Sequence, residues 1–127
     1  MIRITFTDMP PSTNGLRSSF VEGGKVRSVK SKGYASWREA AGWEIASQRP
    51  GKIEGPYRLL VAAQRNWRSK RARDIDNVIK PVSDALVAAG VVVDDSLADC
   101  VTAQWSDDLG GPAIVALVQV AEPGVAA

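Results

Sequence analysis

The sequence predicts an α/β (α+β) two-layer sandwich, in which a mixed sheet of about four to five strands carries two main helices on one face. Three observations support this fold class. Strand-like segments lie near both ends of the chain, two segments with helical periodicity lie between them, and 45% of the 127 residues are hydrophobic. Strands combined with only two helices favour helices packed on one sheet face. A chain of this length is expected to form one domain over 1–127, with 122–127 as a frayed tail.

The first third of the chain is predicted to hold one strand and one long loop. Apolar and polar residues alternate over 2–7, which is the period of a half-buried strand. Residues 8–33 contain Pro10-Pro11 and Gly23-Gly24 and have little periodicity, so we expect a loop there. A loop of this length is unusual in a compact domain and is often functional.

Two helices are predicted from apolar residues that recur on one face. The first covers 34–48. The second covers about 77–89, and Gly90 after it suits the left-handed residue that closes a helix. Trp43 lies off the apolar stripe of the first helix, and either this residue or the last strands are candidates for a dimer contact. The stripe consists of Tyr34, Trp37, Ala41 and Ile45.

The remaining strands are predicted from apolar runs. Residues 57–64 (YRLLVAAQ) form a nearly continuous apolar run, as expected of a central strand. Residues 91–93 are predicted as a short strand that ends at two aspartates. Residues 98–105 and 113–120 are predicted as two further strands around a hairpin-like turn at 107–112.

The residue inventory excludes several classes of site. The chain has one cysteine, Cys100, and no histidine. Disulfide frameworks, zinc fingers and triads that use histidine are therefore excluded. Catalysis would have to use carboxylates, lysine, hydroxyls or a metal ion held by oxygen. We expect Cys100 to be a buried small apolar residue.

No membrane segment is predicted. The longest run of apolar or glycine residues, 85–93, has nine positions, and about 18 are needed to span a bilayer. The first residues lack the apolar region of a signal peptide. A cytoplasmic location is the default expectation.

The charged residues are strongly segregated along the chain. All 16 basic residues lie in 1–80 with seven acids, a net charge of +9, whereas 81–127 has seven acids and no base. A basic surface of this kind favours a polyanionic partner, because it raises both the encounter rate and the affinity for phosphates. The alternative is that the two halves neutralise each other once folded.

The densest cluster of reactive side chains surrounds the second predicted helix. Asp74 and Asp76 precede it, Lys80 lies one turn beyond Asp76, and Asp94-Asp95 follow it. The helix extends about 18 Å, and an extended return to Asp95 covers about 16 Å. We therefore expect Asp94 and Asp95 to lie beside the start of the helix.

Converging carboxylates repel one another unless they share a cation. Mg²⁺ prefers carboxylate oxygens and keeps several waters, one of which can act as a nucleophile, while a lysine stabilises charge on a phosphoryl group. The pattern therefore suits metal-dependent phosphodiester hydrolysis. The alternative is structural: Asp74 or Asp76 caps the helix, Asp76 pairs with Lys80, and Asp94-Asp95 form a turn.

Residues 74–96, DIDNVIKPVSDALVAAGVVVDDS, resemble the signature of the RusA family of Holliday-junction resolvases, which are small nucleases common in phages and prophages. The resemblance implies a Mg²⁺-dependent homodimer, with Mn²⁺ as a substitute ion, that binds four-way DNA junctions and makes paired symmetric nicks. It also implies that Asp74, Asp76 and Asp95 are the essential acids and metal ligands and that Lys80 is the essential lysine. Asp94 is a secondary candidate.

A basic loop immediately precedes these acids. Its functional interpretation is phosphate binding beside the scissile bond, with the tryptophan stacked on an unpaired base. The alternative is a solvated loop with the tryptophan placed against the core. The predicted DNA-binding residues are Arg65, Trp67, Arg68, Lys70, Arg71 and Arg73.

Three functions are consistent with these patterns. The first is a Mg²⁺-dependent endodeoxyribonuclease that resolves four-way junctions. The second is a DNA-binding module without catalysis, in which the acids are caps and turns. The third is a nuclease of the same chemistry that acts on other branched DNA.

Overall fold

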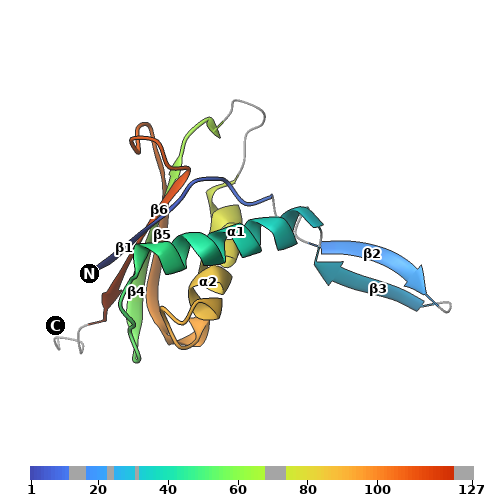
Figure 1. The fold of residues 1–127 in the computed structure, drawn as a ribbon, viewed down its shortest axis with the longest axis horizontal. Coiled ribbons are helices and arrows are strands. Elements are labelled where there is room, and N and C mark those ends of the chain that lie inside the picture. The colour runs from blue at the N-terminus through green and yellow to red at the C-terminus, as the bar shows by residue number, and fades with distance from the viewer. Residues whose placement is uncertain (12–16, 23–24, 31, 68–73, 122–127) are drawn as a thin grey trace.

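A mixed four-stranded sheet forms one layer of the molecule and two helices form the other (Figure 1). The structure, a computed structural model, describes residues 1–11, 17–22, 25–30, 32–67 and 74–121; for 17–22 and 25–30 it describes the backbone. The elements, in chain order, are β1 (Ile2–Phe6), β2 (Arg17–Glu22), β3 (Lys25–Lys30), α1 (Lys32–Gln48), β4 (Tyr57–Gln64), η3 (Ile75–Val78), α2 (Ile79–Ala88), η4 (Asp95–Leu97), β5 (Ala98–Ser106) and β6 (Ile114–Val120).

The strand order in the main sheet is β1-β6-β4-β5. β4 runs parallel to β5, and β6 runs antiparallel to both β1 and β4. The predicted mixed sheet is confirmed, but the predicted hairpin of the last two strands is wrong because β4 lies between them. The turn at 107–112 indicates only that the chain reverses. The apolar run of β4 is buried best with a neighbour on each side, so β4 takes an interior position.

The core fills the space between the sheet and the helices. Alternate residues of β1, β4 and β6 are fully buried on the helix-facing side, as the pleat of a strand requires. The buried residues of α1 are those of the predicted stripe, Tyr34, Trp37, Ala41 and Ile45, so that prediction is confirmed. Trp37 stacks on Phe6, with ring centroids 5.6 Å apart, and its indole N–H donates to the Asp8 carbonyl oxygen at 3.0 Å.

The region predicted as one long loop contains a hairpin. β2 and β3 pair antiparallel as a separate two-stranded sheet, in which Glu22 is paired with Lys25 (Figure 1). This register leaves two residues for the connection, which is the commonest hairpin length, and both are glycine. Gly23-Gly24 was therefore a usable signal for the hairpin that the weak periodicity around it concealed.

The segment from η3 to η4 differs from the predicted helix and strand. The helix begins with the 3₁₀ turn of η3 and continues as α2. Gly90, with φ of 76°, closes α2: its amide donates to the Val87 carbonyl, and the Val91 amide donates to the Leu86 carbonyl. The predicted strand at 91–93 is wrong, because only Val92 forms a β-bridge there, with Ile53.

Two further predictions concern single residues. Cys100 is exposed, not buried, because it lies on β5, the edge strand whose one partner is β4. Trp43 is 73% exposed, as expected from its place off the apolar stripe. Among the described residues, no helix has the length and apolar character needed to cross a bilayer.

Candidate active site

Asp74 and Asp76 are presented by the turn that starts the second helical segment. Asp74 is extended, with φ of −76° and ψ of 137°, and Asp76 lies in the first turn of η3. Val78 is buried and Ile75 packs against the core. Because these two apolar side chains fix the turn to the sheet, the two aspartates between and before them are left on the surface.

The two carboxylates have no structural role that explains them. Asp74 occupies the N-cap position, but its side chain makes no capping hydrogen bond. Lys80 does not pair with Asp76; its ammonium group lies 3.6 Å from a carboxylate oxygen of Asp84. Within the part of the chain that the structure describes, neither Asp74 nor Asp76 makes a side-chain hydrogen bond or ion pair. The structure therefore does not show the alternative roles of these two residues, as a helix cap or as the ion-pair partner of Lys80.

A second acidic group lies beside the second half of α2. Asp84, Asp94 and Asp95 line a shallow depression of roughly 280 Å³ together with Arg38, Val87 and Ala88. Asp84 is held from three sides: the Tyr34 hydroxyl donates to it at 2.9 Å, Arg38 lies 3.9 Å away and Lys80 lies 3.6 Å away. These contacts fix the Asp84 carboxylate and connect Lys80 to the depression.

Asp94 and Asp95 have different surroundings although they are neighbours. The Ser96 hydroxyl donates to the Asp94 carboxylate. This hydrogen bond, together with the amides of Ser96 and Asp95, holds the pKa of Asp94 below its usual value. Asp95 is exposed and begins η4. It is therefore the less constrained of the two carboxylates.

The buried hydroxyl of Tyr57 lies within the electrostatic range of this pair. Burial raises the pKa of Tyr57, and the charges of Asp95 and Asp94 raise it further. Tyr57 is fully buried at the start of β4, where it is paired with Ala98, the residue that follows η4. Its hydroxyl has no hydrogen-bond partner within the described residues. The sequence analysis missed this residue, because an apolar run of a strand gives no sign of what its tyrosine faces.

The structure brings only some of the predicted site residues together. Asp94 and Asp95 share a depression with Asp84, and neither Asp74 nor Asp76 lines it. Asp84 follows Asp76 by eight residues, about 12 Å at the rise of an α-helix. Between α2 and η4, the extended return that was predicted as a strand is represented by a single bridge at Val92.

The basic loop is described at its start only. Arg65 pairs with Asp107 at 2.9 Å, and both side chains are more than half exposed. Trp67 packs against the core, and its indole N–H donates to an Asp8 carboxylate oxygen at 3.3 Å. This placement favours the core alternative for Trp67. Four predicted DNA-binding residues lie outside the described residues: Arg68, Lys70, Arg71 and Arg73.

Comparison with known proteins gives a family for this chain. The family model described as Endodeoxyribonuclease RusA matches residues 8–116. This chain belongs to the RusA family. It is also 34% identical over 76 residues to a curated protein named Crossover junction endodeoxyribonuclease RusA from Aquifex aeolicus (strain VF5). That alignment covers 60% of this chain and 58% of the Aquifex protein.

The carboxylates of this RusA chain fit a divalent metal ion in one binding mode. The described residues include no group of three carboxylate or cysteine side chains placed to hold a metal ion. Mg²⁺, however, is usually held by one or two carboxylates, its remaining positions being filled by water and substrate phosphates. The exposed, unpaired carboxylates of Asp74 and Asp76 fit that mode. Asp95 belongs to the other acidic group in this chain.

Proposed function

We propose that this chain is a Mg²⁺-dependent, structure-selective endodeoxyribonuclease that resolves four-way DNA junctions as a homodimer in the cytoplasm of a bacterial host. The observation that carries the proposal is the pair of exposed carboxylates, Asp74 and Asp76, which have no side-chain partner among the residues that the structure describes and lie inside the region matched by the RusA family model. A carboxylate that does not cap a helix, form an ion pair or stabilise a turn is available to bind a ligand. The name of the Aquifex relative, a crossover junction endodeoxyribonuclease, supports the same substrate class.

In this proposal Asp74 and Asp76 would hold the ion and Lys80 acts on the substrate, while Asp95 remains in the other acidic group. When bound, Mg²⁺ would polarise the scissile phosphoryl group and supply an activated water. The Lys80 side chain is 72% exposed, and its ion pair with Asp84 is weak at such exposure. It can therefore leave Asp84 and neutralise charge that develops on the phosphate in the transition state.

The proposed homodimer explains how cuts would be paired. A two-fold dimer places two equivalent sites on the two strands of a two-fold symmetric junction, so symmetry alone supplies the second nick. The exposed Trp43 is our candidate for a dimer contact, because an exposed tryptophan of this size is unusual on a monomer surface.

The test compares substrates and metal in one assay. A synthetic four-way junction, a flap and a plain duplex of the same sequence are incubated with the full chain in Mg²⁺, in Mn²⁺ and in chelator. We expect nicks in the junction, placed symmetrically, with either ion and none in chelator. Preferential cleavage of the flap would mean that the substrate is another branched DNA and not the four-way junction. Junction binding without nicks in either metal would leave the chain a DNA-binding module.

A further inference from the structure

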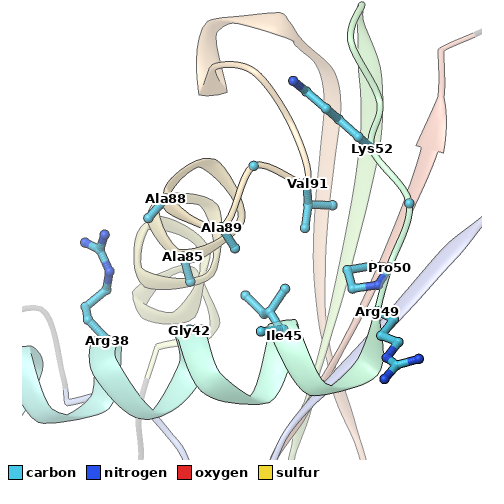
Figure 2. Close-up of a pocket in the computed structure, with 13 residues that line it drawn as sticks. Arg38, Gly42, Ile45, Arg49, Pro50, Lys52, Ala85, Ala88, Ala89 and Val91 are labelled. Atoms are coloured by element: carbon cyan, nitrogen blue, oxygen red, sulfur yellow. The ribbon is translucent and has the colours of Figure 1, made fainter.

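A groove between α1 and α2 lies next to the acidic depression. Its volume is roughly 540 Å³, and it is lined by the second half of α1, the end of α2 and the segment that follows α1 (Figure 2). Arg38 and Ala88 line both the groove and the acidic depression. The two features therefore form one continuous surface that leads from Asp94 and Asp95 across the two helices.

The charge of the groove has one sign. Seven of its thirteen lining residues are alanine or glycine, three are cationic and none is acidic. Figure 2 shows Arg38 at one edge and Lys52 at the other, with small side chains between them. Within the described residues, the side chains of Arg49 and Lys52 make no ion pair, whereas Arg38 has Asp84 as a partner. Two cations without a counter-charge at a shallow apolar floor are complementary to a polyanion.

Two residues of the groove are unfavourable for the backbone conformation that they adopt. Gly42 lies in the middle of α1, where glycine destabilises a helix relative to alanine. No packing requires it, because a Cβ at this position would meet nothing within 4 Å. Arg49 adopts a left-handed conformation, with φ of 49°, at the end of α1, where glycine is preferred. The first residue keeps the groove open and the second places a cation beside it.

We propose that this groove binds the sugar–phosphate backbone of DNA that leads away from the acidic site, with Arg49 and Lys52 contacting phosphates. The inference rests on the proposed nuclease function, whose substrate it extends over a defined surface. The small floor allows the backbone to approach the two helices closely. The unpaired cations replace counterions that the phosphates would otherwise retain, so binding through the groove must depend on salt.

The test removes the two cations and compares the result with a matched change elsewhere. In R49Q/K52Q the groove loses two positive charges. In R3Q/R58Q the protein loses the same charge on the sheet face that carries no helix, because both arginines alternate with buried residues of their strands. Arg58 lies 3.7 Å from Asp99, a pair that is weak because both side chains are about half exposed. Binding to a four-way junction is measured in chelator over a range of salt. We expect R49Q/K52Q to bind the junction about 10-fold more weakly than the parent. We also expect the slope of the logarithm of the binding constant against the logarithm of the salt concentration to become shallower by about 2 per chain.

A second variant tests the shape of the groove and leaves its charge intact. G42L fills the open space above the floor, and A40L adds the same side chain to an exposed position of α1 outside the groove. We expect G42L to melt no lower than the parent and to lose junction affinity, and A40L to retain it. Equal slopes for the two charge variants, or full affinity of G42L, would overturn the proposal.

Two other outcomes distinguish DNA binding in the groove from self-association of the chain and from the proposed nuclease function. If G42L changes the mass of the protein in solution without DNA, as seen by sedimentation, the groove holds a second copy of the chain and the proposal is wrong. If the parent binds the junction with the expected salt slope but never nicks it in Mg²⁺, the nuclease function fails while the groove stands.

Discussion

The fully buried hydroxyl of Tyr57 leads to a prediction whose sign is unusual. Tyr57 is 0% exposed, and its hydroxyl has no hydrogen-bond partner among the described residues. A buried polar group without a partner costs about 1–3 kcal/mol, because it has lost its bonds to water. Tyr57→Phe removes that group and keeps the ring. We therefore expect the substitution to raise the free energy of unfolding by about 1 kcal/mol, after the loss of contacts by one oxygen atom is allowed for.

The other buried tyrosine provides the matched control. Tyr34 is 4% exposed, and its hydroxyl donates to Asp84 at 2.9 Å. Tyr34→Phe should therefore lower the free energy of unfolding by about 1–2 kcal/mol. Urea unfolding followed by tryptophan fluorescence measures both variants at pH 7. A loss of more than about 1 kcal/mol in Tyr57→Phe would refute the reasoning, because it would mean that the hydroxyl has a partner in solution, such as a buried water.

Three further predictions concern stability and protonation. Burial raises the pKa of both Tyr57 and Tyr34 above the ordinary value of 10.0, so the folded state holds these protons more tightly than the unfolded state. The contribution of these tyrosines to the free energy of unfolding should therefore be fully present below pH 10 and decline as the pH rises above it. The decline should be less steep in Tyr57→Phe, and urea midpoints measured between pH 8 and 11 would show it. Leu86→Ala deletes a 0% exposed side chain of α2 and should cost about 3 kcal/mol in a denaturant titration; a cost below about 1 kcal/mol would mean that α2 is not docked as described. Ser96→Ala removes the hydrogen bond that contributes most to the lowered pKa of Asp94, so an NMR titration should show that pKa rising toward its ordinary value, and an unchanged value would contradict the assigned cause.

The local features of the fold could be predicted because each rests on a short-range pattern. The stripe from Tyr34 to Ile45 and the alternation of β1 reflect the periods of a helix and a strand, and both are buried as those periods require. Gly90 was identified as a helix stop, and the amides of Gly90 and Val91 donate the two hydrogen bonds of that motif. In the candidate site, Asp74 and Asp76 were identified from their position directly before the second helix, and both are exposed there.

The long-range features could not be predicted, because they depend on which segments meet. A reversal at 107–112 indicates antiparallel directions but not that β4 lies between β5 and β6. The predicted strand at 91–93 is reduced to one β-bridge because its partner, Ile53, lies in a distant segment that no local pattern indicates. Asp84 was not predicted to be the centre of a cluster, because two of its partners, Tyr34 and Arg38, come from α1. Only its spacing from Lys80 was visible in the sequence.

In the proposed function, the carboxylates before α2 serve the cleavage of DNA and not the stability of the chain. Single-turnover cleavage of a four-way junction in Mg²⁺ by Asp76→Asn tests it most directly, alongside junction binding in chelator. Asp108→Asn is the control, because it makes the same charge change at a turn where the side chain accepts a hydrogen bond from the Gly110 amide. We predict that Asp76→Asn loses on the order of 100-fold or more in rate with unchanged binding and melting temperature, while Asp108→Asn cleaves like the parent. Equal rates for the two variants, or a loss in Asp76→Asn that follows a lower melting temperature, would contradict the account.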